Sequence, residues 1–152
     1  MRIQDHLVPG RIVLLKAKAK AQALGELVCL LADDAPGIER EELSRAVLQR
    51  ESLMSTGIGQ GLGVPHVRMA GLRQVMMAIG VSREGIEDYG SLDGKAVRII
   101  LLIGAPAGQH EEYIRLLALV TEVLKSAELR EAILAAKSPQ DVYSLLTGGG
   151  PS

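Results

Sequence analysis

Hydrophobic and polar residues along the chain follow two periods, one typical of helices and one typical of buried strands. Apolar residues recur at intervals of three and four, which predicts helices over residues 17–32, 39–50, 111–126 and 129–136. A fifth helix is predicted from residue 138 onward, because Ser138, Pro139 and Asp141 supply an N-cap, a proline in the first turn and an early acid. Short continuous apolar runs predict strands over residues 12–15, 75–81 and 97–103. A strand as uniformly apolar as residues 97–103 needs cover on both faces. We therefore expect an α/β fold, a three-layer sandwich in which helices flank both faces of a central mixed β-sheet.

The chain has 152 residues, a length that suits one domain. We expect a loose N-terminal lead-in over residues 1–10, a single domain over residues 11–147 and a flexible tail over residues 148–152. The first residues lack the basic and apolar pattern of a signal peptide, and no apolar run approaches the roughly 20 residues that span a bilayer. These features predict a cytoplasmic protein that is not embedded in a membrane.

The composition narrows the possible functions. Hydrophobic residues make up 47% of the chain and charged residues 23%, which excludes a disordered protein. The formal net charge is −1, and there are 3 Tyr but no Phe or Trp, so neither a basic field nor stacking surfaces favour nucleic-acid binding. The single cysteine, Cys29, excludes an intramolecular disulfide and a cysteine-only metal site.

The most unusual segment is residues 55–66, in which glycine occupies every second position at residues 57, 59, 61 and 63. Alternate residues of an extended chain face the same side, so an extended segment would have one face without side chains. Glycine in a strand costs conformational entropy and leaves nothing to pack. We therefore expect the backbone here to approach another element, a ligand or a docking protein closely.

Several familiar chemistries are excluded by residue spacing. The glycine segment fits neither the dinucleotide-binding pattern nor the Gly-Lys-Ser/Thr ending of a P-loop. Ile114 stands where a zinc protease would need a second histidine after His110 and Glu111. The Gly-x-Ser-x-Gly elbow of serine hydrolases does not occur. We expect no metal and no cofactor.

His66 is the residue with the clearest chemical potential. It follows Pro65, whose ring restricts the local backbone and gives the imidazole a defined direction. An imidazole with one free, unprotonated nitrogen acts as a nucleophile or a base near neutral pH. Arg50 ends a predicted helix upstream, and if it faced His66 its guanidinium could hold a transferring phosphoryl group through two parallel hydrogen bonds. The alternative for Arg50 is a surface salt bridge with Glu51 or Glu42.

These residues together resemble the signature of enzyme IIA of the mannitol/fructose type, a component of the bacterial phosphoenolpyruvate-dependent sugar phosphotransferase system. The resemblance extends over residues 13–146 and rests on Arg50-Glu51, Ser55-Thr56-Gly57-Ile58-Gly59 and Gly61 through Pro65-His66. It implies that His66 accepts a phosphoryl group from the small carrier HPr or its nitrogen-branch relative, and that Arg50 steadies the phosphate. It also implies phosphate or docking contacts at Ser55, Thr56, Gly57, Gly59 and Gly61, although capping or turn formation explains the two hydroxyl residues equally well.

The sequence departs from this family at the start of the helix that follows residues 97–103. Members carry a second active-site histidine there, whereas Tyr113 takes that position in this chain, and His110 lies three residues earlier, about one helical turn away. Two interpretations stay open. Either the Tyr113 hydroxyl donates a hydrogen bond in place of the histidine, or His110 reaches the site from the preceding turn. A solvated His110 beside two glutamates is the simpler alternative.

The resemblance favours a phosphohistidine carrier that passes its phosphoryl group to a IIB component or holds it as a regulatory signal. No second carrier domain is present in this sequence, which favours a nitrogen-regulatory role over that of a dedicated sugar importer. The alternative is a non-catalytic regulatory binding module of the same fold, which docks on a transporter, a sensor kinase or another regulator.

Overall fold

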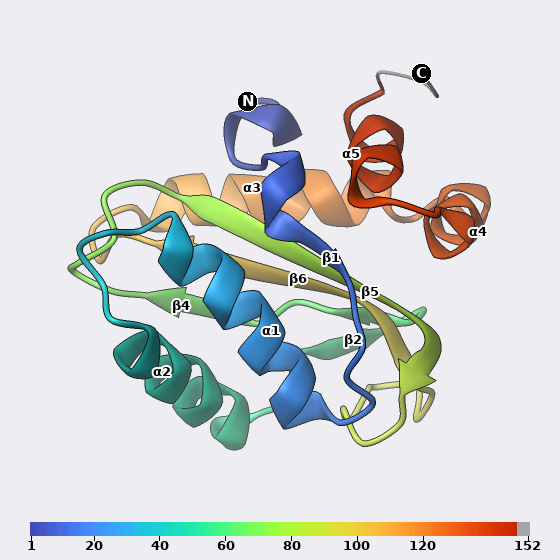
Figure 1. Cartoon of the computed structure of the whole chain (residues 1–152), viewed down its shortest axis with the longest axis horizontal. Coiled ribbons are helices and arrows are strands. Elements are labelled where there is room, and N and C mark those ends of the chain that lie inside the picture. The colour runs from blue at the N-terminus through green and yellow to red at the C-terminus, as the bar shows by residue number, and fades with distance from the viewer. Residues whose placement is uncertain (149–152) are drawn as a thin grey trace.

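A mixed β-sheet forms the centre of the molecule, and helices cover both of its faces (Figure 1). The computed structural model describes residues 1–148. The helices are α1 (Lys20–Asp33), α2 (Arg40–Leu53), α3 (His110–Val123), α4 (Ala127–Ala135) and α5 (Pro139–Thr147). The strands are β1 (Ile12–Leu14), β2 (Gly57–Gly59), β3 (Leu62–Gly63), β4 (His66–Arg68), β5 (Met76–Ile86) and β6 (Val97–Ala105). All eight helices and strands expected from the sequence are present.

The order of the strands places His66 at one end of the sheet. The order is β1-β5-β6-β3-β2, and β4 also pairs with β6. Strands β5 and β6 are antiparallel, whereas β3 and β4 both run parallel to β6. Leu62 in β3 pairs with Ile99, and His66 in β4 pairs with Ile103 farther along the same strand. Strand β4 therefore continues the pairing of β3 along one edge of β6, toward the loop that leads into α3.

Two hydrophobic cores lie on opposite faces of the sheet, which confirms the three-layer sandwich. Strand β6 serves both: Ile99, Leu101 and Ile103 face one core, and Ile100 and Leu102 face the other. Alternation along a strand produces this division. Helices α1 and α2 cover the second core, and α3, α4 and α5 cover the first (Figure 1). The continuous apolar run over residues 97–103 is explained by this two-sided burial.

The N-terminal residues are packed against the domain, so the expectation of a loose lead-in over residues 1–10 is wrong. Two 3-10 turns, η1 (Ile3–Asp5) and η2 (Pro9–Arg11), begin the chain. Ile3 and Leu7 are buried, and the His6 Nδ1 atom lies 3.0 Å from the Val75 carbonyl oxygen. The contacts of this segment reach residues nearly 70 positions away in sequence, and local composition does not reveal them.

The alternating glycines form a hairpin and not one extended strand. Strands β2 and β3 are antiparallel, and Gly59 at the end of β2 and Gln60 and Gly61 between the strands have φ angles of 96°, 58° and 78°. Glycine adopts this left-handed region without steric cost. The other two glycines permit close packing, since an added Cβ would lie 2.6 Å from the Gly90 oxygen at Gly57 and 2.8 Å from the ring of Tyr89 at Gly63. The expected approach to another element is confirmed at these two positions, but a single face without side chains does not form.

The start of the chain's last helix follows the sequence signals. Ser138 caps α5, with its hydroxyl accepting a hydrogen bond from the Asp141 backbone nitrogen at 3.2 Å, and Pro139 occupies the first turn. Gly148 ends the helix in a left-handed conformation. The remainder of the predicted tail, residues 149–152, lies outside the described residues. No helix within residues 1–148 combines the length and the apolar character needed to cross a membrane.

Candidate functional site

Strand β4 presents His66 and Arg68 on the same side of the strand. Residues two apart in a strand point the same way, and Val67 between them packs into the core under α1 and α2. The Ile103 backbone nitrogen donates a hydrogen bond to the Pro65 carbonyl oxygen at 3.0 Å, which fixes the strand immediately before His66. The imidazole therefore projects from a short strand that is anchored to the centre of the sheet.

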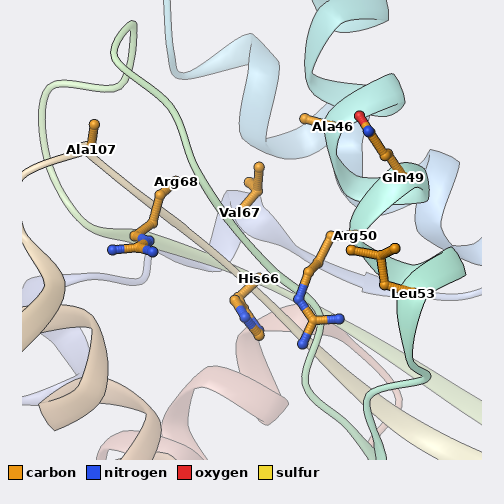
Figure 2. Close-up of a pocket in the computed structure, with 8 residues that line it drawn as sticks. All are labelled: Ala46, Gln49, Arg50, Leu53, His66, Val67, Arg68 and Ala107. Atoms are coloured by element: carbon orange, nitrogen blue, oxygen red, sulfur yellow. The ribbon is translucent and has the colours of Figure 1, made fainter.

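A pocket of about 580 Å³ lies between α2 and β4. It is lined by Ala46, Gln49, Arg50, Leu53, His66, Val67, Arg68 and Ala107. Figure 2 shows the guanidinium of Arg50 beside the imidazole of His66, with the side chain of Arg68 on the other side of the ring. The eight lining residues include two arginines and no carboxylate. The charge of this pocket therefore favours anions.

The environment of His66 keeps its imidazole neutral. The Nδ1 atom lies 3.4 Å from the Val64 carbonyl oxygen, which can only accept a hydrogen bond, so the proton belongs on Nδ1 and the lone pair on Nε2. Burial lowers the pKa of His66, and the charges of Arg50 and Arg68 lower it further, against the opposing effects of the Val64 carbonyl and Glu51. A neutral imidazole with a free Nε2 is the nucleophilic form of histidine.

Arg50 forms no salt bridge with a carboxylate within residues 1–148, so its guanidinium can bind an anion in the pocket. It lies in the last turn of α2, and its Nη1 donates to the Met54 carbonyl oxygen at 3.1 Å. The salt bridges found within residues 1–148 include none between Arg50 and Glu51 or Glu42, so the alternative of a surface pair is not observed. Glu51 is buried and pairs with Lys20 at 3.0 Å instead.

Both candidates for the second site residue lie near the pocket, in different positions. The ring of Tyr113 is 5.0 Å from that of His66 between centroids, and burial raises the pKa of its hydroxyl, which stays protonated. His110 is exposed, and its Nδ1 lies 3.3 Å from Nη1 of Arg68. Tyr113 is thus the direct neighbour of His66, and His110 contacts Arg68.

The five residues of the glycine segment expected to contact phosphate or a partner do not line this pocket. Thr56 donates to Glu51 Oε1 from both its backbone nitrogen and its hydroxyl, at 3.0 and 2.9 Å, and the hydroxyl of Ser55 donates to the Tyr89 carbonyl oxygen at 2.8 Å. The glycines 57, 59 and 61 belong to the β2–β3 hairpin. Their observed contacts hold the hairpin and its entry in place.

Arg68 is the charged residue of the pocket that the sequence interpretation missed. The available signal was its position two residues after His66 in an extended segment, which puts both side chains on one side. No group of three His, Cys, Asp or Glu side chains within the described part of the chain is arranged to hold a metal ion.

Comparison with known proteins identifies the family. Residues 6–148 match the profile of the family described as phosphoenolpyruvate-dependent sugar phosphotransferase system, EIIA 2. The chain belongs to this family. The resemblance drawn from the motif around His66 is thereby confirmed, and the EIIA 2 family supplies a phosphotransfer component of the sugar phosphotransferase system.

Individual relatives of this EIIA chain carry two kinds of name. It is 31% identical to a fructose-specific EIIA component of Haloferax volcanii, over 89% of this chain and 88% of the relative. It is 26% identical to a nitrogen regulatory protein of Pseudomonas aeruginosa, over 96% and 95% of the two chains. A fructose-specific EIIABC component of Bacillus subtilis is 31% identical over 96% of this chain, which spans 23% of that longer protein.

A solved structure agrees with the fold. The crystal structure of nitrogen regulatory protein IIA-Ntr from Neisseria meningitidis superposes with a TM-score of 0.87, at 28% identity, over 95% of this chain and 99% of that one. The family therefore includes both sugar-system and nitrogen-regulatory relatives of this chain.

Proposed function

We propose that this EIIA chain accepts a phosphoryl group on Nε2 of His66 from an HPr-class phosphocarrier. The phosphorylated chain then passes the group to a IIB component or holds it as a regulatory signal. The observation that carries the proposal is the neutral imidazole of His66, with Nδ1 directed at a carbonyl oxygen, in a pocket that contains two arginines and no carboxylate.

The chemical step needs little more than position and charge. The Nε2 lone pair forms a new N–P bond while the P–N bond of the donor's phosphohistidine breaks, and the electron pair of that bond stays on the donor nitrogen. The Nδ1 proton remains directed at the Val64 carbonyl oxygen throughout. Phosphoryl transfer of this kind depends mainly on in-line positioning and on neutralising charge at the phosphoryl oxygens.

Arg50 and Tyr113 supply the two interactions that this step requires beyond the nucleophile. The Arg50 guanidinium lies beside the imidazole, where it can take two phosphoryl oxygens at once (Figure 2). Tyr113 stays protonated because burial raises its pKa, so its hydroxyl can donate a hydrogen bond to a phosphoryl oxygen. A neutral donor in place of a second histidine would keep this interaction constant across the pH range in which histidine titrates.

In this proposal, the surface of the chain that binds the partner protein surrounds the pocket. Leu53 and Met54, at the end of α2, are 78% and 71% exposed, and Leu53 also lines the pocket. Exposed apolar side chains beside a cationic pocket suit the docking of another protein. The same surface would serve a non-catalytic binding module that docks on a transporter or a sensor kinase. The proposed transfer of phosphoryl groups from phosphoenolpyruvate also implies that the chain works in the cytoplasm.

Phosphorylation separates these two functions. The chain is incubated with phosphoenolpyruvate, enzyme I and the HPr-class carriers of the same organism. We expect one acid-labile, alkali-stable phosphate per chain, with a nitrogen–phosphorus bond detected by NMR at the His66 ring and at no other imidazole. His66→Ala should take up no label, whereas His110→Gln should still be labelled. Equal labelling of His66→Ala and the parent would refute the carrier function, and a complete lack of labelling would favour the binding module.

A further inference from the structure

Arg68 occupies a position in the pocket that the proposed mechanism does not yet use. It extends from β4 on the same side as His66, is exposed, and lines the pocket together with Arg50. In Figure 2 the imidazole lies between the two arginine side chains. The two cations come from different elements, α2 and β4, so the pocket combines charges that are distant in sequence.

The charge of Arg68 is not matched by a carboxylate in the structure. None of the salt bridges found within residues 1–148 includes Arg68 or Arg50. The buried Arg11, by contrast, pairs with Asp34 at 2.8 Å. The polar contact of Arg68 is with Nδ1 of His110 at 3.3 Å. A guanidinium has only donors, so this contact requires a neutral His110 with its lone pair on Nδ1.

A phosphoryl group suits such a pair of cations. It carries about two negative charges near neutral pH, and a guanidinium presents donors in a planar fork that matches its oxygens. Both arginines are close enough to lower the pKa of His66 and to oppose the raised pKa of Tyr113. Arg68 is exposed, and the rotatable bonds of its long side chain allow the guanidinium to turn from His110 toward a group on Nε2.

We propose that Arg50 and Arg68 form a two-arginine anion site, in which Arg68 is the second cation on the phosphoryl group of His66 and His110 is a positioning residue for Arg68. This inference rests on the proposed function of His66 for the phosphorylated state. Binding of free phosphate to the same pocket does not depend on that function.

Two measurements test the site without a protein donor. The first is the dissociation constant for inorganic phosphate, followed through the NMR signals of the His66 ring. The second is the half-life of phosphohistidine after labelling with phosphoramidate, whose P–N bond breaks as Nε2 binds phosphorus and ammonia leaves. Variants are Arg68→Gln and Arg68→Lys. Arg73→Gln is the matched control, since Arg73 is exposed and lines a different pocket with Asp34 and Pro36.

We expect Arg68→Gln to weaken phosphate binding about fivefold, the size typical of an exposed charged contact, and to change the half-life of phosphohistidine. Arg68→Lys should retain part of the affinity, because it keeps the charge but loses the fork. Arg73→Gln should behave as the parent does. Parent-like values for Arg68→Gln in both measurements would overturn the two-arginine site.

His110 is tested by rescue. His110→Leu removes the acceptor for Arg68 and should weaken phosphate binding about twofold, whereas His110→Gln restores an acceptor and most of the affinity. Equal loss in both variants would overturn the positioning role. Failure of the proposed function is distinguishable, because the protein carriers would then leave His66 unlabelled while phosphate binding at the two arginines persists.

Discussion

Replacing Lys20 with methionine should destabilise the protein by about 3 kcal/mol, because it leaves a buried carboxylate without its counter-charge. The Lys20 ammonium lies 3.0 Å from Glu51 Oε1, with the two side chains 18% and 4% exposed. It also donates to the Ser55 hydroxyl and the Tyr89 carbonyl oxygen, at 3.1 and 2.9 Å. Glu51 Oε2 is buried and has no hydrogen-bond partner within the described residues, so the carboxylate depends on its other oxygen.

The magnitude follows from the contacts that remain. Removing one partner of a buried ion pair costs roughly 3–5 kcal/mol. The lower end applies here, because Glu51 keeps two hydrogen bonds from Thr56 and Lys20 is still 18% exposed. Methionine has a similar helix propensity and keeps the apolar stem packed, and loss of a cation at the N-terminus of α1 is mildly favourable. The melting temperature should fall by roughly 6–12 °C for a chain of this size.

Urea denaturation of three variants measures the effect. Lys18→Met is the matched control, since Lys18 and Glu84 form a surface pair at 3.3 Å with side chains 79% and 73% exposed. Its removal should cost less than about 0.5 kcal/mol. Adding Glu51→Gln to the Lys20 variant should recover part of the loss, because the uncompensated charge disappears. Equal costs for Lys18→Met and Lys20→Met would refute the reasoning.

Three further predictions concern the site and its glycine segment. The pKa of His66 should lie below 6.5, because burial, and then the two arginines, disfavour the protonated ring. Phosphoryl acceptance by His66 and the contribution of its neutral ring to stability should be complete above pH 6.5 and should be lost as the pH falls through the lowered pKa. An NMR titration midpoint above pH 6.5 would contradict this. Tyr113→Phe should slow labelling of His66 about tenfold at an unchanged melting temperature, and a parent-like rate would exclude the hydroxyl as a donor. Gly63→Ala should lower the free energy of unfolding by about 1–3 kcal/mol, because the added Cβ would clash with the buried ring of Tyr89. Gly25→Ala, in a helix with open space around it, should raise that free energy by about 0.5–1 kcal/mol. Equal effects in denaturation experiments would be inconsistent with the packing.

The helices, the long strands and the family were accessible from sequence because local patterns indicate them. The apolar run of β6 required burial on two faces, and its residues do divide between two cores. Ser138 and Pro139 predicted the start of α5 correctly, because a cap needs only the residues of one turn. The family was suggested by the resemblance of Arg50-Glu51, the glycine segment and Pro65-His66 to its signature, and the family match over residues 6–148 confirms it.

The hairpin was not accessible, because the same glycine spacing satisfies two conformations. Alternating glycines fit an extended strand, and they also fit a tight turn in which Gly59, Gln60 and Gly61 all have positive φ. The hairpin is selected by packing of Tyr89 against Gly63 and of Gly90 against Gly57. These contacts come from about 30 residues away in sequence. Burial of His6 against Val75 was hidden for the same reason. Long-range contacts of this kind have no local signature.

Arg50 and Glu51 are neighbours in sequence but contact different groups around the last turn of α2. Arg50 reaches the pocket, whereas Glu51 is buried and accepts hydrogen bonds from Lys20 and Thr56. Thr56 leads into the hairpin whose second strand is followed by His66, so the buried carboxylate connects the helix that carries the cation to the segment that carries the nucleophile. Phosphoryl transfer is sensitive to displacements as small as about 1 Å. Burying the Glu51 carboxylate costs free energy, but the carboxylate fixes the backbone of Thr56 and the ammonium of Lys20 at once. An apolar residue could pack in its place but could not make these two contacts.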